Sequence, residues 1–361
     1  MKIAERTIKD YKGHGVSLLH HWKTHGYELN LLPICKPLNI LHGLYEWKSR
    51  KHFLKSRPFL FRLNTSAICN LRCSPCLRKE SFNLKPGQSR EPYMMSLEIF
   101  DKLISQTGSY AQRMTFHITG EPLMNAKLFE MVKKAHECKV FTYFSTNFTL
   151  MTPELLPQLF ESGLDKIKIC FDGFSQEAYG KYRVGGDVEK LKQEIAMTME
   201  EKRRRGTSRP VVEVQIITFF HVQPELPQIK QFCQDHGVDR IVTLPDGCNF
   251  DGSHTLTVQG KMYTGCFWPW LNMAVDSDGS VYTCGQGFDD LIPYGNVKTD
   301  TIDSIWNNEL YTETRRFLSG KSARREDLKL KCYNCPDGFG HQGPVVMSKG
   351  KPPYLSRNQK G

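Results

Sequence analysis

The chain has 361 residues, with 49 lysines and arginines against 38 aspartates and glutamates, which gives a formal net charge of +11. This length suits one large domain and one small one, each with its own core. Residues 1–12 are polar and no run of about 18 apolar residues follows, so we expect a cytoplasmic protein without a signal peptide or membrane-spanning helix. Twelve cysteines in a reducing compartment favour metal or redox chemistry over disulfides.

The positive charge lies at the two ends of the chain. Residues 1–57 hold 11 basic and 4 acidic residues, and residues 349–361 hold 4 basic residues and no acid, so residues 58–348 are neutral. A neutral body argues against a nucleic-acid partner, which would require basic residues interleaved with aromatic ones there.

We predict a basic helical segment over residues 1–57. Its amphipathic run, residues 38–47, is followed by Lys48, Arg50, Lys51 and Lys55. Apolar residues beside a basic cluster are typical of segments that lie on an anionic membrane, so we include a peripheral membrane contact among the expected partners. Packing of the segment along the body of the protein is the interpretation that we favour.

Three cysteines follow a β-prone run at residues 59–65. Cys69, Cys73 and Cys76 stand in CNLRCSPC, and the next cysteine, Cys138, is far downstream. A structural zinc site needs four ligands, whereas three thiolates can hold an iron–sulfur cluster and leave one iron open. Three free or zinc-bound thiols in a loop are the alternative.

Strands and helices then alternate along the chain. Further strands are predicted at residues 114–118, 140–145, 166–171, 211–217 and 240–244, and helices at residues 96–106, 126–137, 153–161, 188–205 and 225–236. Six strands with helices between them indicate a parallel α/β fold. In such folds the loops after the strands carry the active site.

The CxxxCxxC spacing resembles that of the radical S-adenosylmethionine (SAM) superfamily. The resemblance implies a partial (β/α)6 TIM-like barrel over residues 58–247. It also implies a [4Fe-4S] cluster on Cys69, Cys73 and Cys76, whose open iron binds SAM. A low-potential donor such as flavodoxin or ferredoxin would supply the electron that cleaves SAM to a 5′-deoxyadenosyl radical.

Residues after the later strands are similar to SAM contacts of this family. Thr119-Gly120-Glu121-Pro122 resembles the GGEP segment that holds the SAM ammonium group, with Thr119 in place of the first glycine. Pro75 stands where the family usually has a bulky or aromatic residue. The resemblance implies further SAM contacts by Ser145, Asn147, Asp172, Arg183 and Gln215, among which the arginine would pair with the SAM carboxylate.

A second cysteine set comprises Cys266, Cys284, Cys332 and Cys335. Four thiolates can close a site around a cluster or a zinc ion. Two segments resemble the SPASM/twitch extension, CFWPWLNMAVDSDGSVYTC and TIDSIWNNELY. This resemblance implies one auxiliary [4Fe-4S] cluster in a small domain over residues 248–340. A zinc ribbon is the alternative. We predict a disordered basic tail over residues 341–361.

The reaction that follows hydrogen abstraction stays open among three outcomes. One is oxidation, with the second electron passing to the auxiliary cluster. Another is epimerisation, in which Cys248, in a turn after the sixth strand, returns a hydrogen atom; an inert loop cysteine is the alternative. A third is modification of a peptide. The basic segment before the cysteines resembles members from sugar and glycolipid pathways, so we expect a small-molecule or glycan substrate. A zinc-dependent nucleic-acid-binding module is the non-enzymatic alternative.

Overall fold

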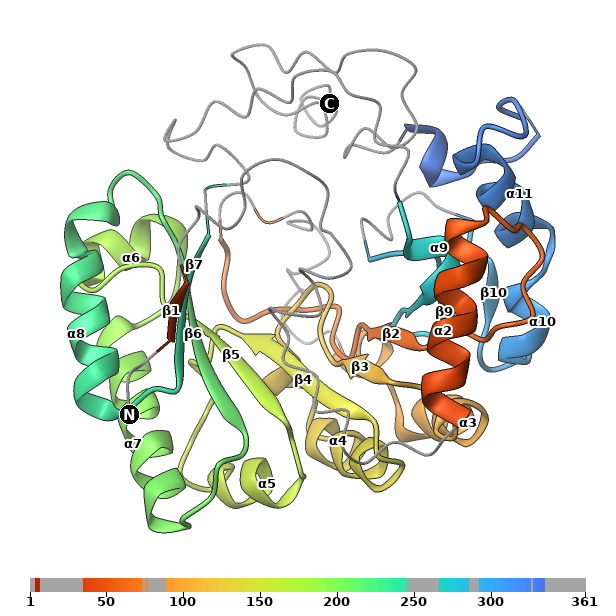
Figure 1. The fold of residues 1–361 in the computed structure, drawn as a ribbon. Coiled ribbons are helices and arrows are strands. Elements are labelled where there is room, and N and C mark those ends of the chain that lie inside the picture. Colours follow the sequence, from red (N-terminus) through yellow and green to blue (C-terminus); the bar gives the residue numbers. More distant parts are fainter. Residues whose placement is uncertain are drawn as a thin grey trace.

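The computed structural model describes residues 4–6, 35–73, 76, 89–244, 246, 266–285, 292–325 and 327–334. Its centre is a curved sheet of ten strands in the order β1-β7-β6-β5-β4-β3-β2-β8-β9-β10 (Figure 1). Helices pack along one face of this sheet. Within the described ranges, the structure contains no helix that is long and apolar enough to cross a membrane.

Six parallel strands form the body of the sheet and confirm the α/β fold expected from the sequence. Each pairs with its neighbour in the chain, as in a partial (β/α)6 barrel. Each begins within one residue of the predicted position. They are β2 (Leu60–Leu63), β3 (Arg113–Thr115), β4 (Phe141–Thr146), β5 (Lys166–Cys170), β6 (Val211–Ile217) and β7 (Arg240–Leu244).

The two faces of these strands differ in polarity. On β6, Val212, Val214 and Ile216 are completely buried and belong to the core shared with the helices. Because side chains alternate along a strand, Glu213 and Gln215 lie on the opposite face. Parallel sheets are usually apolar on both faces. The polar inner face therefore indicates that these side chains serve a role other than packing of the core.

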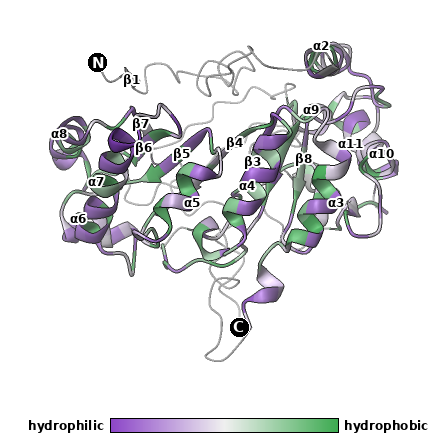
Figure 2. Cartoon of the chain, turned by 90° about the horizontal axis from the view of Figure 1, so that it is seen from below, coloured by the Kyte–Doolittle hydropathy of each residue, from purple (hydrophilic) through white to green (hydrophobic). Residues whose placement is uncertain are grey.

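The helices between the strands cover the outer face. Figure 2 shows hydrophilic and hydrophobic residues along each of them, as expected for helices that pack on one side. The side chains of Ser96 and Asp187 cap two of them by accepting hydrogen bonds from backbone N–H groups. The helices are α3 (Leu97–Thr107), α4 (Leu128–Glu137), α5 (Leu156–Glu161), α6 (Gln176–Tyr182), α7 (Val188–Arg204) and α8 (Leu226–His236), with 3₁₀ turns η3 (Glu91–Tyr93), η4 (Pro122–Met124) and η5 (Gln223–Glu225). Of these helices, α6 lies outside the sequence prediction.

Four further strands also lie outside the sequence prediction. β1 (Ala4–Arg6) pairs in parallel with β7, and β8 (Asn272–Val275) pairs in parallel with β2 at the other edge of the barrel. β9 (Ser280–Tyr282) and β10 (Gly295–Asn296) continue from β8 as antiparallel strands. The C-terminal segment thus extends the barrel sheet directly, beside the strand that leads to Cys69.

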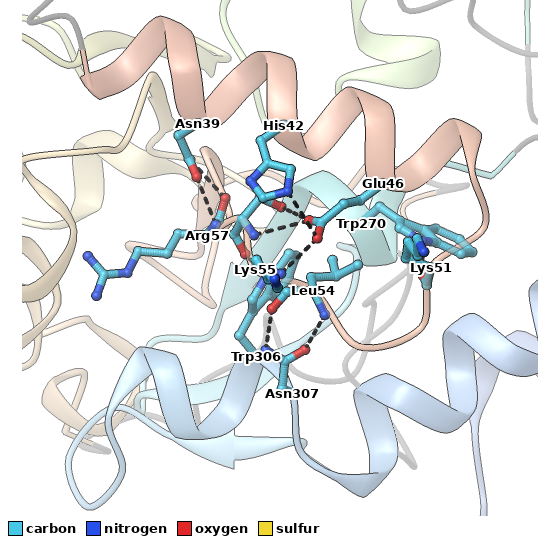
Figure 3. Close-up of polar contacts among 11 residues, drawn as sticks. Asn39, His42, Glu46, Lys51, Leu54, Lys55, Arg57, Trp270, Trp306 and Asn307 are labelled. Carbon is cyan, nitrogen blue, oxygen red and sulfur yellow. Dashed lines mark hydrogen bonds and ion pairs between the residues drawn. The ribbon is translucent and has the colours of Figure 1, made fainter.

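Hydrogen bonds connect the helix α2 (Cys35–Lys48) to residues 51–57, and these residues in turn contact the C-terminal helices (Figure 3). The buried Glu46 carboxylate accepts hydrogen bonds from the backbone N–H groups of Lys55 (2.8 Å) and Ser56 (3.0 Å) and from the Ser56 hydroxyl (2.6 Å). The Ser56 carbonyl accepts one from Trp306 Nε1 at 2.8 Å. Such satisfied buried networks hold segments in one arrangement. The C-terminal helices are α9 (Trp268–Leu271), α10 (Ile302–Trp306) and α11 (Glu309–Leu318), followed by η6 (Lys331–Asn334).

The turn after β3 lies directly against the loop after β2. The N–H of Glu121 donates to the carbonyl of Ile68 at 2.8 Å. Gly120 has a φ of +55°, and a Cβ at this position would lie 2.3 Å from the Ser66 carbonyl oxygen and 2.6 Å from that of Ile68. Only glycine permits both this conformation and this approach.

We expect the substitution Gly120→Ala to lower the free energy of unfolding by about 3 kcal/mol or more, since it combines left-handed strain with an overlap against backbone. Gly237→Ala is the matched control, because Gly237 has a φ of +73° but nothing within 4 Å of its added Cβ. The control should lose only about 1 to 2 kcal/mol. Urea denaturation measures both; equal losses would contradict the steric role of Gly120.

Candidate functional site

The three clustered cysteines lie on the loop that follows β2. Cys73 is buried, Cys69 and Cys76 are half-buried, and the N–H of Cys76 donates to the carbonyl of Cys73 at 3.1 Å. Burial raises the pKa of Cys69 to about 12, although a hydrogen bond from the Leu71 N–H opposes the shift. Burial also raises the pKa of Cys73, against the opposing effect of Arg183. These thiols therefore hold their protons until a metal displaces them.

Glu121 joins the end of β3 to the end of β4. Its buried carboxylate accepts hydrogen bonds from the Thr146 hydroxyl (2.5 Å), the Asn147 N–H (2.8 Å) and the Leu123 N–H (3.1 Å). Burial raises the pKa of Glu121, while these three donors oppose the shift. A carboxylate has about four acceptor positions, so one remains for a further donor. The next residue, Pro122, is buried and begins η4.

Asn147 connects β4 to the cysteine loop. Its side-chain amide donates to the Asn70 side chain at 2.9 Å and lies 3.7 Å from the Cys69 sulfur. Thr149 completes the network by donating to Asn147 and accepting from Asn70. Asn70 and Thr149 were missed in the sequence, although the position of Asn70 directly after Cys69 is a signal that could have found it.

Arg183 reaches the same loop from the end of α6. Its Nε and Nη2 donate to one oxygen of the fully buried Asp172 at 2.8 and 2.5 Å, and its Nη1 lies 3.8 Å from the Cys73 sulfur. Asp172 also accepts from the Ile217 N–H at 2.6 Å, which anchors it to the end of β6. Burial would lower the pKa of Arg183, but Asp172 and neighbouring acidic groups outweigh it and raise that pKa well above its ordinary value.

Ser145 and Gln215 lie on the polar inner face rather than at the loop. The Ser145 N–H donates to Nδ1 of His117 at 3.0 Å, and its hydroxyl lies 3.5 Å from the Cys170 sulfur. Gln215 is half-buried on β6 and pairs in register with Cys170. His117 was missed in the sequence, although it stands two residues before Thr119, in the segment that follows β3.

Two cysteines of the second set, Cys284 and Cys332, lie near two buried tyrosines. Cys266 precedes α9, Cys284 follows β9 and Cys332 lies in η6, and all three are buried or half-buried. The pKa of Tyr294 and of Tyr311 is raised first by burial and then by both Cys284 and Cys332, so these two thiols lie near the same rings. Cys335 and Cys248 lie outside the described residues.

The donor set of the first loop fits an iron–sulfur cluster. Cys69, Cys73 and Cys76 supply three thiolates from one loop. A [4Fe-4S] cluster spreads its thiolate ligands over separate irons. Asn147 and Arg183 also direct N–H groups toward two of the sulfurs, the type of hydrogen bond that tunes a cluster. The residues present therefore fit an iron–sulfur cluster.

Comparisons with known proteins agree with this arrangement. Residues 63–218 match the model of the Radical SAM superfamily, and residues 266–336 match that of the iron–sulfur cluster-binding domain SPASM. The two domains imply a SAM-binding [4Fe-4S] cluster and an auxiliary iron–sulfur cluster.

Curated relatives and solved structures resemble most of the chain. The tungsten-containing aldehyde ferredoxin oxidoreductase cofactor-modifying protein of Pyrococcus furiosus is 22% identical over 299 residues, which cover 69% of this chain and 81% of that protein. The S-adenosyl-L-methionine-dependent 2-deoxy-scyllo-inosamine dehydrogenase of Niallia circulans is 23% identical over 279 residues, covering 76% and 92%. The crystal structure of Streptococcus suis SuiB bound to the precursor peptide SuiA has the same fold, with a TM-score of 0.56, 14% identity and coverage of 90% and 81%.

The three-cysteine loop, the strand ends that surround it and both domain matches lead to one conclusion: the chain belongs to the radical SAM superfamily and carries a SPASM domain C-terminal to its radical SAM domain.

Proposed function

We propose that this enzyme dehydrogenates an unactivated carbon of a carbohydrate-type small molecule. The observation that carries the proposal is the similarity to the 2-deoxy-scyllo-inosamine dehydrogenase, which covers 92% of that enzyme's length. The SPASM domain of this chain supports it, because an auxiliary cluster can accept an electron. When bound, SAM would supply a radical that removes one hydrogen atom from the substrate, and the auxiliary cluster would accept the second electron while a proton is released to solvent. A low-potential donor such as flavodoxin or ferredoxin would deliver the first electron.

The residues around the loop would orient SAM. The remaining acceptor position of Glu121 suits the SAM ammonium group, and the Nη1 edge of Arg183 suits the carboxylate. Asp172 acts through Arg183, because it is fully buried and holds the other edge of the guanidinium. Asp172 is therefore a positioning residue in this proposal, whereas Glu121 and Arg183 contact SAM.

We expect the substitution Cys73→Ala to abolish conversion of SAM to 5′-deoxyadenosine by the reduced, reconstituted protein, because the cluster loses one of its three thiolates. Chromatography of the products, with iron and sulfide analysis, measures the effect. Cys138→Ala is the matched control, since Cys138 is half-buried at the end of α4 and should leave the yield unchanged. A Cys73→Ala protein that still forms 5′-deoxyadenosine would refute the assignment.

Mass spectrometry of products formed in deuterated water separates dehydrogenation from epimerisation. With 2-deoxy-scyllo-inosamine as the probe, dehydrogenation should give a product that lacks two hydrogens and carries no solvent deuterium at carbon. An unchanged oxidation level with one carbon-bound deuterium that disappears in Cys248→Ala would instead establish epimerisation and overturn the dehydrogenase proposal. A modified peptide as the only product would favour the peptide-modifying alternative.

We also propose that α2 docks on an anionic lipid surface. Leu38, Leu41 and Tyr45 are 60%, 63% and 61% exposed and form one stripe, while Glu46 on the other side of the helix is buried. Figure 2 places α2 at the periphery of the molecule. The exposed Lys48, Lys51 and Lys55 follow the stripe, and this combination of apolar and basic groups complements anionic lipids.

Flotation with phosphatidylcholine vesicles that contain phosphatidylserine tests this docking. The full chain should float with these vesicles, less so at high salt, and the double substitution Leu38→Asp and Leu41→Asp should abolish flotation. Phe220→Asp is the control, because Phe220 is an equally exposed apolar residue elsewhere on the surface, at 69%. Equal flotation of the control and the double variant would end the membrane proposal.

A further inference from the structure

The inner face of the barrel carries an excess of positive charge. On this face, the strands β2 to β8 carry one acidic side chain, that of Glu213, and five basic side chains. The basic residues are Arg62, Arg113, Lys166, Lys168 and Arg240. Although the body of the chain is neutral in total, the inner face of its described strands is therefore basic.

These cations converge on one aromatic ring. The centroid of the Tyr143 ring lies 5.7 Å from Cζ of Arg113, 5.0 Å from Nζ of Lys166 and 5.8 Å from Nζ of Lys168. The ring of His117 lies 5.4 Å from the same centroid. Three adjacent strands thus direct their polar groups to one region of the inner face.

The carboxylate of Glu213 is shared between two lysines. Its oxygens lie 3.5 Å from Nζ of Lys166 and 3.6 Å from Nζ of Lys168. The pKa of Lys166 is lowered to about 7, mainly by burial and further by repulsion from Lys168 and Arg240. The attraction of Glu213 offsets only part of this lowering. Like charges held this close in a poorly solvated interior favour the binding of an anion.

His117 is prepared to donate to such an anion. Burial lowers its pKa well below the usual range, and Arg62, Lys168, Lys166 and Arg113 lower it further, so the imidazole is neutral. Its Nδ1 accepts the Ser145 N–H, which assigns the ring proton to Nε2. Nε2 is therefore a hydrogen-bond donor in the region where the cations gather.

Three of these groups remain partly accessible. Arg62, His117 and Lys168 are half-buried, whereas Arg113 and Lys166 are each only 1% exposed. Lys168 lies on β5, which ends at Cys170, and Asp172 follows four residues after Lys168. The two residues are therefore separated by at most roughly 13 Å of extended chain. A substrate of moderate size can span this distance.

We propose that the inner face binds a phosphoryl group of the substrate, contacted by Lys168, Arg62 and His117, while the carbon that reacts lies at the carboxyl end of the sheet. The assignment rests on the proposed function for the position of that carbon, and it narrows the substrate to a phosphorylated carbohydrate-type molecule. Arg113 and Arg240 contribute the field that favours multiple negative charges, and Lys166 adds to this field in its protonated form.

Isothermal titration of the full-length holoprotein with inorganic pyrophosphate tests the proposal. Wild-type protein should bind the probe, and Lys168→Gln and Arg62→Gln should each weaken binding by at least about tenfold, as expected for loss of a charge-assisted hydrogen bond. Lys168→Arg should retain binding, because it keeps the charge. Lys181→Gln is the control, since Lys181 is an exposed lysine on α6, and it should bind as the wild type does. Circular dichroism verifies that each variant is folded.

Undiminished binding by Lys168→Gln and Arg62→Gln would place the probe elsewhere, for instance on the basic ends of the chain, and would overturn the proposal. Absence of binding by wild-type protein that forms 5′-deoxyadenosine would overturn it while leaving the SAM chemistry intact. Wild-type protein that binds pyrophosphate through these residues but does not cleave SAM would uphold the anion site and refute the proposed function instead.

Discussion

The buried Glu121 carboxylate is the contact on which the arrangement of the site depends. The carboxylate accepts hydrogen bonds from Thr146 and Asn147 at the end of β4. The backbone N–H of Glu121 donates to the carbonyl of Ile68 in the cysteine loop. Buried charges persist only where hydrogen bonds compensate their lost hydration, so this group holds three loop ends in one relation. Gly120 permits the close approach, because any side chain there would overlap the backbone of the loop. The distance between Asn147 and the Cys69 sulfur follows from these contacts.

The net charge of the chain does not indicate where charged side chains gather in the fold. The chain is basic at its ends and neutral over its body, yet the inner face of the barrel gathers arginines and lysines around Tyr143. At the carboxyl end of the same sheet, Asp172 neutralises Arg183 and directs the free edge of its guanidinium toward Cys73. Among the described strand residues, the first set has more basic than acidic side chains, which suits an external anion. The second is already paired and suits orientation of a ligand.

The body of the fold was predictable because its signals are local. Each of the six strands is a short β-prone run bounded by turn residues, and each helix shows an apolar stripe that begins near a cap such as Ser96 or Asp187. β8 was not predictable in the same way. Its four residues form a strand because β2 offers an unpaired edge, with the N–H of Asn64 donating to the carbonyl of Val275, and this edge exists only after the barrel has formed.

The sequence by itself indicated the ligand chemistry of the first cysteine set, because three closely spaced thiolates can hold an iron–sulfur cluster and leave one iron open. For the four later cysteines it left a cluster and a zinc ion as alternatives. It also determined where the site lies, because parallel strands expose their carboxyl ends at one edge. Only the tertiary structure decided which residues besides the cysteines lie near the sulfurs. It also decided which strand side chains meet on the inner face of the barrel. Asn70, His117 and Lys168 carry no motif, and they acquire a role through contacts between strands that are distant in the chain. Such contacts join side chains of different strands and loops that are distant in the chain, so no local pattern of residues reveals them.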